Sequence, residues 1–143
     1  MNTALPLAVT ANPHLEGLGG VEAVVRLVDA FYRAMDTRGD ARTIRAMHEC
    51  DLTATKSVLV KYLIQWLGGA ASYSAERGTP ALRRRHQRFD IDAAARDAWM
   101  ACMQQALAET CVDAELRASL EAAFAKIAQH IQNTEPTSTH RSP

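Results

Sequence analysis

The sequence lacks an excess of either charge and lacks any long apolar run. Its 143 residues hold 16 Lys and Arg against 16 Asp and Glu, so the formal net charge at pH 7 is 0. A neutral chain exerts no long-range attraction on nucleic acid or on an anionic membrane surface. No apolar run approaches the roughly 20 residues that a membrane-spanning helix needs. We therefore expect neither a nucleic-acid partner nor a membrane partner, and the length predicts one domain.

Cysteine is also scarce, and its spacing is uninformative. Cys50, Cys102 and Cys111 are odd in number and form no Cys-x-x-Cys motif. Such a set predicts neither a disulfide framework nor a zinc site, and it favours a reducing cytoplasm. The chain also lacks a Ser-His-acid triad pattern, a glycine-rich phosphate loop after a strand and a His-Glu-x-x-His motif. These absences exclude the enzyme classes that the motifs mark.

Runs of β-branched residues and strand-type alternation are nearly absent, so the sequence predicts an all-α protein. The clearest helix follows Gly19 and Gly20, and we expect Gly39 to close it from just past its end. Its apolar side chains recur at helical spacing. They are Val21, Val24, Val25, Val28, Phe31, Tyr32 and Met35.

Four further helices and one loop are expected after the short segment that follows Gly39. Asp51 or Thr53 is expected to cap a helix that Gly68 and Gly69 terminate. Residues 70–79 are small and polar and read as a loop, after which Pro80 suits the first turn of a short helix over residues 81–87. Asp92 and Asp113 are expected to cap the last two helices, whose buried positions include Trp99, Met103, Leu120 and Phe124.

Four side chains are candidates for chemistry. His86 lies among arginines in the sequence LRRRHQRF, where an isolated histidine is ordinarily a solvated surface residue and less often a metal ligand. The basic run itself could bind phosphate, but no aromatic residues alternate with it to stack on bases. Tyr32 and Trp99 lie on apolar helix faces, where core packing is the simplest interpretation. A buried hydroxyl and a buried indole N–H each need an acceptor, which a ligand with oxygen atoms would supply. His48 is by default a surface histidine.

Seven short motifs occur in a recognisable order along the chain. They are Gly19-Gly20, Phe31-Tyr32, IRAMH ending at His48, WLGG at 66–69, SYSAERG around Tyr73, LRRRH ending at His86, and RDAWMACM around Trp99. Each is weak alone, but together they resemble the truncated, two-on-two haemoglobins of group II. The resemblance covers residues 15–133, with residues 1–14 and 134–143 expected to be disordered extensions.

The resemblance implies an all-α, two-on-two α-helical sandwich around haem b, with His86 as the proximal iron ligand. It also implies distal ligand-binding positions at Tyr32, His48, Thr55, Leu59 and Trp99. Haem-packing positions are implied at Tyr62, Leu63, Phe89, Ile91 and Met103. Candidates for binding the propionates are Tyr73, Arg83 and Arg85, since guanidinium and hydroxyl groups pair with carboxylates.

The implied function is reversible binding of O2, and of CO or NO, for oxygen transport or scavenging. One alternative is a haem-dependent redox enzyme, an NO dioxygenase or peroxidase-like protein, which would need a separate reductase as partner. A second alternative is a helical interaction domain without cofactor, and the chain could be a monomer or a homodimer. The sequence departs from the family pattern at Thr79, Arg88 and Glu49, and none of these positions carries a predicted ligand.

Overall fold

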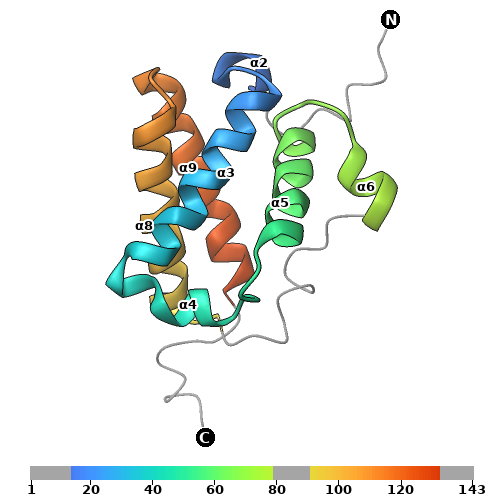
Figure 1. The fold of residues 1–143 in the computed structure, drawn as a ribbon. Helices are drawn as coiled ribbons and strands as arrows, with labels where there is room; N and C mark the ends of the chain where they lie inside the picture. The colour runs from blue at the N-terminus through green and yellow to red at the C-terminus, as the bar shows by residue number, and fades with distance from the viewer. Residues whose placement is uncertain (1–13, 79–90, 133–143) are drawn as a thin grey trace, which may run out of the picture. The chain divides into compact units, whose positions relative to one another are not determined.

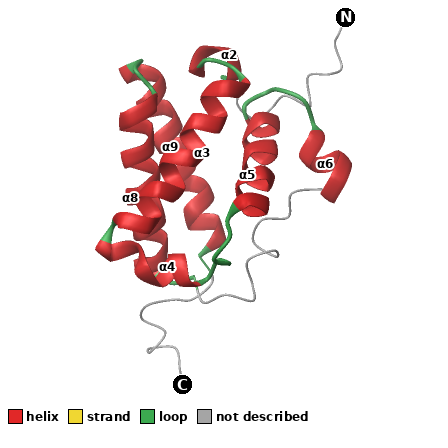
Figure 2. Ribbon diagram, in the orientation of Figure 1, coloured by secondary structure: helices red, strands yellow, loops and turns green. Residues whose placement is uncertain are grey.

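The computed structural model describes residues 14–78 and 91–132. Every regular element in these ranges is a helix (Figure 2), as the all-α prediction requires. The described residues fall into two compact units, considered separately below: residues 14–29 with 51–78, and residues 30–50 with 91–132. The predicted helix over 81–87 and the predicted disordered extensions, residues 1–14 and 134–143, lie outside the described ranges except for His14. No described helix has the length and apolar character that a membrane crossing demands.

The first unit contains α2 (Leu15–Leu18), the start of α3 (Val21–Thr37), α5 (Thr53–Trp66) and α6 (Ser72–Arg77) (Figure 1). Gly19 and Gly20 join α2 to α3 with φ angles of 122° and 84°. Glycine adopts this left-handed region without steric cost, which explains the double glycine before the long helix. The Leu15 N–H donates to the Leu67 carbonyl at 3.0 Å and ties α2 to the end of α5.

Helix α6 contradicts the prediction that residues 70–79 form a loop. Six residues are too few for a helix that is stable by itself, so contacts with α5 stabilise it. The Gln65 amide group donates to the Ser74 hydroxyl at 2.8 Å and accepts from the Ser74 backbone N–H at 2.9 Å. Lys61 adds an ion pair with Glu76 at 2.8 Å. These partners lie nine and fifteen residues apart, beyond what helical periodicity within 70–79 can reveal.

The second unit contains the remainder of α3, the 3-10 helix η1 (Gly39–Ala41), α4 (Arg42–Ala46), α8 (Ala93–Thr110) and α9 (Ala114–Ile131). Helices α8 and α9 pack side by side (Figure 1). Both N-caps predicted for this unit are confirmed, whereas the cap predicted for α5 at Asp51 or Thr53 is wrong, because Leu52 holds that position without a side-chain hydrogen bond. The Asp92 carboxylate accepts from the Ala95 N–H at 2.8 Å, and the Asp113 carboxylate accepts from the Glu115 N–H at 3.0 Å. These acceptors satisfy backbone donors that a helix start leaves unpaired.

The predicted role of Gly39 is wrong. Helix α3 ends at Thr37, and Arg38 leaves it in an extended conformation with φ −82° and ψ 132°. Gly39 then begins η1 and is not among the glycines of positive φ. The Arg38 guanidinium bonds Asp40 and Gln105, which favours the extended exit over a glycine cap. The periodic pattern also overstated burial at the helix start, since Val21 is 50% exposed and Val25 is 42% exposed.

Candidate functional site

The predicted site residues fall into three groups. In the first unit lie Thr55, Leu59, Tyr62, Leu63 and Tyr73. In the second unit lie Tyr32, His48, Ile91, Trp99 and Met103. Outside the described residues lie Arg83, Arg85, His86 and Phe89. The geometry of the first two groups is given in turn.

The second unit brings three predicted distal residues into one aromatic cluster. The ring of Phe31 meets Tyr32 at 4.9 Å between centroids and Trp99 at 5.4 Å, both edge-to-face. Trp99 in turn meets Phe124 at 5.9 Å. His48 lies 5.8 Å from Tyr32, with the ring planes at 76°. Edge-to-face pairs at these separations are favourable, so the cluster fixes Tyr32 and Trp99 through Phe31. Sequence reasoning gave no site role to the two phenylalanines, although Phe31 belongs to the Phe31-Tyr32 motif and Phe124 was expected to be buried.

Tyr32 is a hydrogen-bond donor held in the protein interior. Its side chain is buried, and this burial raises the pKa of Tyr32 well above its ordinary value, while the nearby Arg45 cation acts weakly in the opposite direction. A phenol with a raised pKa keeps its proton at neutral pH. Its hydroxyl forms no hydrogen bond to any other residue within 14–78 and 91–132. The proton is therefore not committed to another described residue.

His48 is held at two atoms by helix α4. Its backbone N–H donates to the Arg45 carbonyl at 3.0 Å, and its Nδ1 lies 2.8 Å from the Ile44 carbonyl oxygen. A carbonyl oxygen only accepts, so Nδ1 carries the proton and donates it to Ile44. In the neutral ring Nε2 then has a lone pair and is an acceptor. The backbone thus gives His48 a hydrogen-bonding role opposite to that of Tyr32.

In the first unit, helix α5 carries predicted positions on one half-buried face. Thr55, Leu59 and Tyr62 follow at intervals of four and three residues and are each partly exposed, whereas Leu63 is fully buried. Tyr62 contacts Tyr73 edge-to-face at 5.4 Å, and burial, with a smaller effect of Tyr73, raises the pKa of Tyr62 to about 12. Thr55, Leu59 and Tyr62 are thus only partly covered by the described residues, and their roles toward haem stay a prediction.

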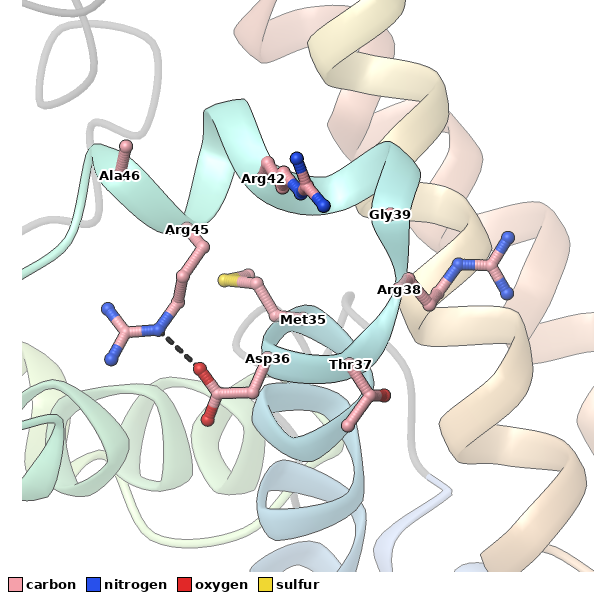
Figure 3. Close-up of a pocket in the computed structure, with 8 residues that line it drawn as sticks. All are labelled: Met35, Asp36, Thr37, Arg38, Gly39, Arg42, Arg45 and Ala46. Carbon is pink, nitrogen blue, oxygen red and sulfur yellow. Dashed lines mark hydrogen bonds and ion pairs between the residues drawn. The ribbon is translucent and has the colours of Figure 1, made fainter.

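A surface pocket of about 320 Å³ lies elsewhere in the second unit, where α3 ends and α4 begins (Figure 3). None of the predicted site residues lines it. Two of its three arginines are already engaged, Arg38 with Asp40 and Arg45 with Asp36. It is lined by Met35, Asp36, Thr37, Arg38, Gly39, Arg42, Arg45 and Ala46. The pocket is therefore separate from the aromatic cluster.

Comparison with known proteins identifies the class. The family model described as bacterial-like globin matches residues 14–133, and the chain belongs to this family. It is similar to the group II two-on-two haemoglobin of Agrobacterium tumefaciens, at 38% identity and a TM-score of 0.82, over 88% of this chain and 97% of that one. It is also similar to the truncated oxygen-avid haemoglobin of Bacillus subtilis, at 33% identity and a TM-score of 0.77, over 85% and 99%.

The same comparisons specify the branch of the family. The curated group 2 truncated haemoglobin YjbI of Bacillus subtilis is 33% identical over 114 residues, which are 80% of this chain and 84% of that protein. The chain is thus a group II truncated haemoglobin with the two-on-two globin fold, as the ordered motifs indicated. Membership of the globins implies a haem cofactor and small gaseous ligands.

The described residues fit such a cofactor. Haem needs apolar side chains to pack on its faces, and hydrogen-bonding groups near the iron decide how a bound gas is held. Helix α5 offers the half-buried Leu59 and Tyr62, and the second unit offers the donor Tyr32 beside the acceptor His48. No charged side chain is fully buried among the described residues. In each unit, taken by itself, these side chains have chemistry that suits haem.

Proposed function

We propose that this protein binds O2, and also CO or NO, reversibly on haem b with His86 as the proximal iron ligand. The observation that carries the proposal is the buried side chain of Tyr32, which belongs to the same aromatic cluster as Trp99. When bound, haem supplies the ferrous iron to which a diatomic gas adds. The residues of the chain then decide how long the gas stays.

The roles of the distal residues follow from their hydrogen-bonding chemistry. Tyr32 and Trp99 are donors, and dioxygen polarised by ferrous iron is an acceptor, so each donor slows its release. His48 accepts through Nε2 in its neutral form and orders a nearby donor. Thr55 and Leu59 complete the distal positions in the proposal. Packing on haem is assigned to Tyr62, Leu63, Phe89, Ile91 and Met103, and propionate binding to Tyr73, Arg83 and Arg85.

The first test is the rate of O2 release from the ferrous protein, measured by stopped flow with CO or dithionite as the trap. Tyr32→Phe removes one hydroxyl, and losing a hydrogen bond to a polarised ligand is expected to speed release about tenfold. Trp99→Leu is expected to act in the same direction. Thr37→Val is the matched control, because it removes a hydroxyl on the same helix that bonds only the helix backbone at 3.0 and 3.4 Å.

Two results would contradict the proposal. If Tyr32→Phe and Trp99→Leu both release O2 at the wild-type rate, the distal assignment is wrong. The iron ligand is tested by His86→Ala, which is expected to lose or strongly alter the Soret band. A wild-type absorption spectrum in this variant would exclude His86 as the ligand.

A further inference from the structure

One arginine joins three backbone segments of the second unit. The Arg45 Nε donates to the Asp36 carboxylate at 2.6 Å, at the end of α3 (Figure 3). Its Nη1 donates to the Glu49 carbonyl at 2.9 Å, and its Nη2 donates to the Cys50 carbonyl at 3.1 Å. All three guanidinium nitrogens are thus in use, on acceptors that lie on both sides of α4.

The segments that Arg45 joins carry two polar residues of the proposed distal pocket, Tyr32 and His48. His48 lies in the turn that Arg45 holds through the Glu49 and Cys50 carbonyls. Tyr32 lies on α3 four residues before Asp36, and residues four apart share one face of a helix. Arg45 therefore connects the helix of Tyr32 with the turn of His48.

We infer that Arg45 is a positioning residue for the distal pocket and that it holds His48 in place beside Tyr32. The inference rests on the proposed function, because the register matters only if these residues face the bound gas. Arg45 is also the cation that opposes the effect of burial on the pKa of Tyr32. The departure at Glu49 leaves the arrangement intact, since Arg45 uses the backbone carbonyl of that residue.

The alternative is an ordinary surface ion pair, which contributes little to stability or to anything else. One observation and one chemical argument favour the positioning role. The Arg45 side chain is 24% exposed, whereas Arg33 in the surface pair with Glu109 is 61% exposed. Lysine could replace a simple ion pair, but it lacks the planar fork of donors that reaches several acceptors at once. Arg45→Lys can therefore keep an ion pair with Asp36 but loses the hydrogen bonds to the Glu49 and Cys50 carbonyls.

The experiment uses the full-length, haem-loaded ferrous protein and compares Arg45→Lys and Arg45→Ala with the wild type. The C–O stretching band of the CO complex reports the distal hydrogen bonds, and ¹⁵N NMR of the same complex reports the tautomer of His48. Both variants are expected to broaden or split the C–O band and to mix the His48 tautomers. O2 release is expected to become about three- to tenfold faster, the range for weakening one hydrogen bond.

The control is Arg42→Ala, three residues earlier on α4. Arg42 is exposed and lines the same pocket, and it forms no ion pair or hydrogen bond with another described residue. It is expected to leave the C–O band and the His48 tautomer unchanged. If Arg42→Ala matches Arg45→Ala, the effect is a general loss of positive charge and the inference is overturned.

Tyr32→Phe separates the inference from the proposed function. If Tyr32→Phe shifts the C–O band and speeds O2 release while both Arg45 variants behave as wild type, Arg45 has no positioning role and the proposed function stands. If Tyr32→Phe also changes nothing, the distal assignment fails and the inference fails with it. Should Arg45→Ala not fold, the band, tautomer and release rate of Arg45→Lys decide the question.

Discussion

The tightest glycine of the first unit provides a quantitative test of the packing. A Cβ atom added to Gly69 would lie 2.6 Å from Leu15 Cδ2 and 2.8 Å from Ile64 Cγ2, with the Ile64 carbonyl oxygen at 3.1 Å. Real Cβ contacts essentially never fall below 3.0 Å, so Gly69→Ala forces atoms to move. The backbone of Gly69 does not have a positive φ, and the substitution therefore tests space and not conformation.

The cost follows from which neighbours can move. The Leu15 side chain can rotate, but the branched Ile64 side chain is restricted at χ1. The Ile64 carbonyl accepts from the Gly69 N–H at 2.8 Å, so separating the two backbones weakens that hydrogen bond. Overpacking of this kind costs about 1–3 kcal/mol. For a chain of this size that is a fall in Tm of roughly 4 °C for each kcal/mol.

The assay is thermal and urea unfolding of Gly69→Ala, with Gly39→Ala as the matched control in the same haem state. Gly39 also lacks a positive φ, but a Cβ there meets nothing within 4 Å. Gly39→Ala is expected to be neutral or to stabilise the protein by a few tenths of a kcal/mol up to about 1 kcal/mol, because it reduces the entropy of the unfolded chain. If Gly69→Ala is no less stable than Gly39→Ala, the packing argument at the α2–α5 contact is refuted.

Three further outcomes are expected. Asp113→Ala should lower the free energy of unfolding by about 1 kcal/mol, because the carboxylate accepts from two N–H groups at the start of α9; unchanged urea unfolding would contradict the cap. The exposed Cys50 should react with a maleimide in the native protein before the buried Cys102 and Cys111 do. Burial also raises the pKa of the Cys102 thiol to about 11, which lowers its reactivity. Early modification of Cys102, detected by mass spectrometry, would contradict this order. Burial raises the pKa of Tyr62 to about 12, whereas a tyrosine in the unfolded chain has a pKa of about 10. The contribution of Tyr62 to stability is therefore complete below pH about 10 and is lost between pH about 10 and 12. Tyr62→Phe should flatten that part of the alkaline unfolding curve, and an unaltered curve would count against this assignment.

Local signals in the sequence were sufficient for the helix starts of the second unit. Asp92 and Asp113 each precede an apolar periodic segment, and an N-cap needs only one acceptor within three residues of its donors. The stop of α5 was equally local, since Gly68 has a φ of 100° directly after the helix. Such features depend on neighbours in the chain, so one sequence reveals them.

Features that depend on distant partners were missed or misassigned. Helix α6 exists through the bonds of Gln65 to Ser74, and a window over residues 70–79 contains only one side of that contact. The exit of α3 through Arg38 likewise depends on Gln105 in α8. In both cases a side-chain partner in another element outweighs the local preference for a loop or a glycine cap.

In the candidate site, too, the sequence indicates which residue types are present but not the hydrogen-bonding role that a partner gives them. The ordered motifs selected Tyr32, His48 and Trp99 as candidates, and in the structure Phe31 joins Tyr32 to Trp99 while His48 contacts Tyr32. They could not indicate whether His48 donates or accepts, because an imidazole can do either. The Ile44 carbonyl decides this, since it accepts a hydrogen bond from Nδ1–H and so leaves Nε2 of the neutral ring as the acceptor. In the proposed function, Tyr32 and Trp99 donate to the bound gas, and neutral His48 accepts at Nε2. A change that frees His48 from the Ile44 carbonyl is therefore expected to alter gas release with Tyr32 and Trp99 unchanged.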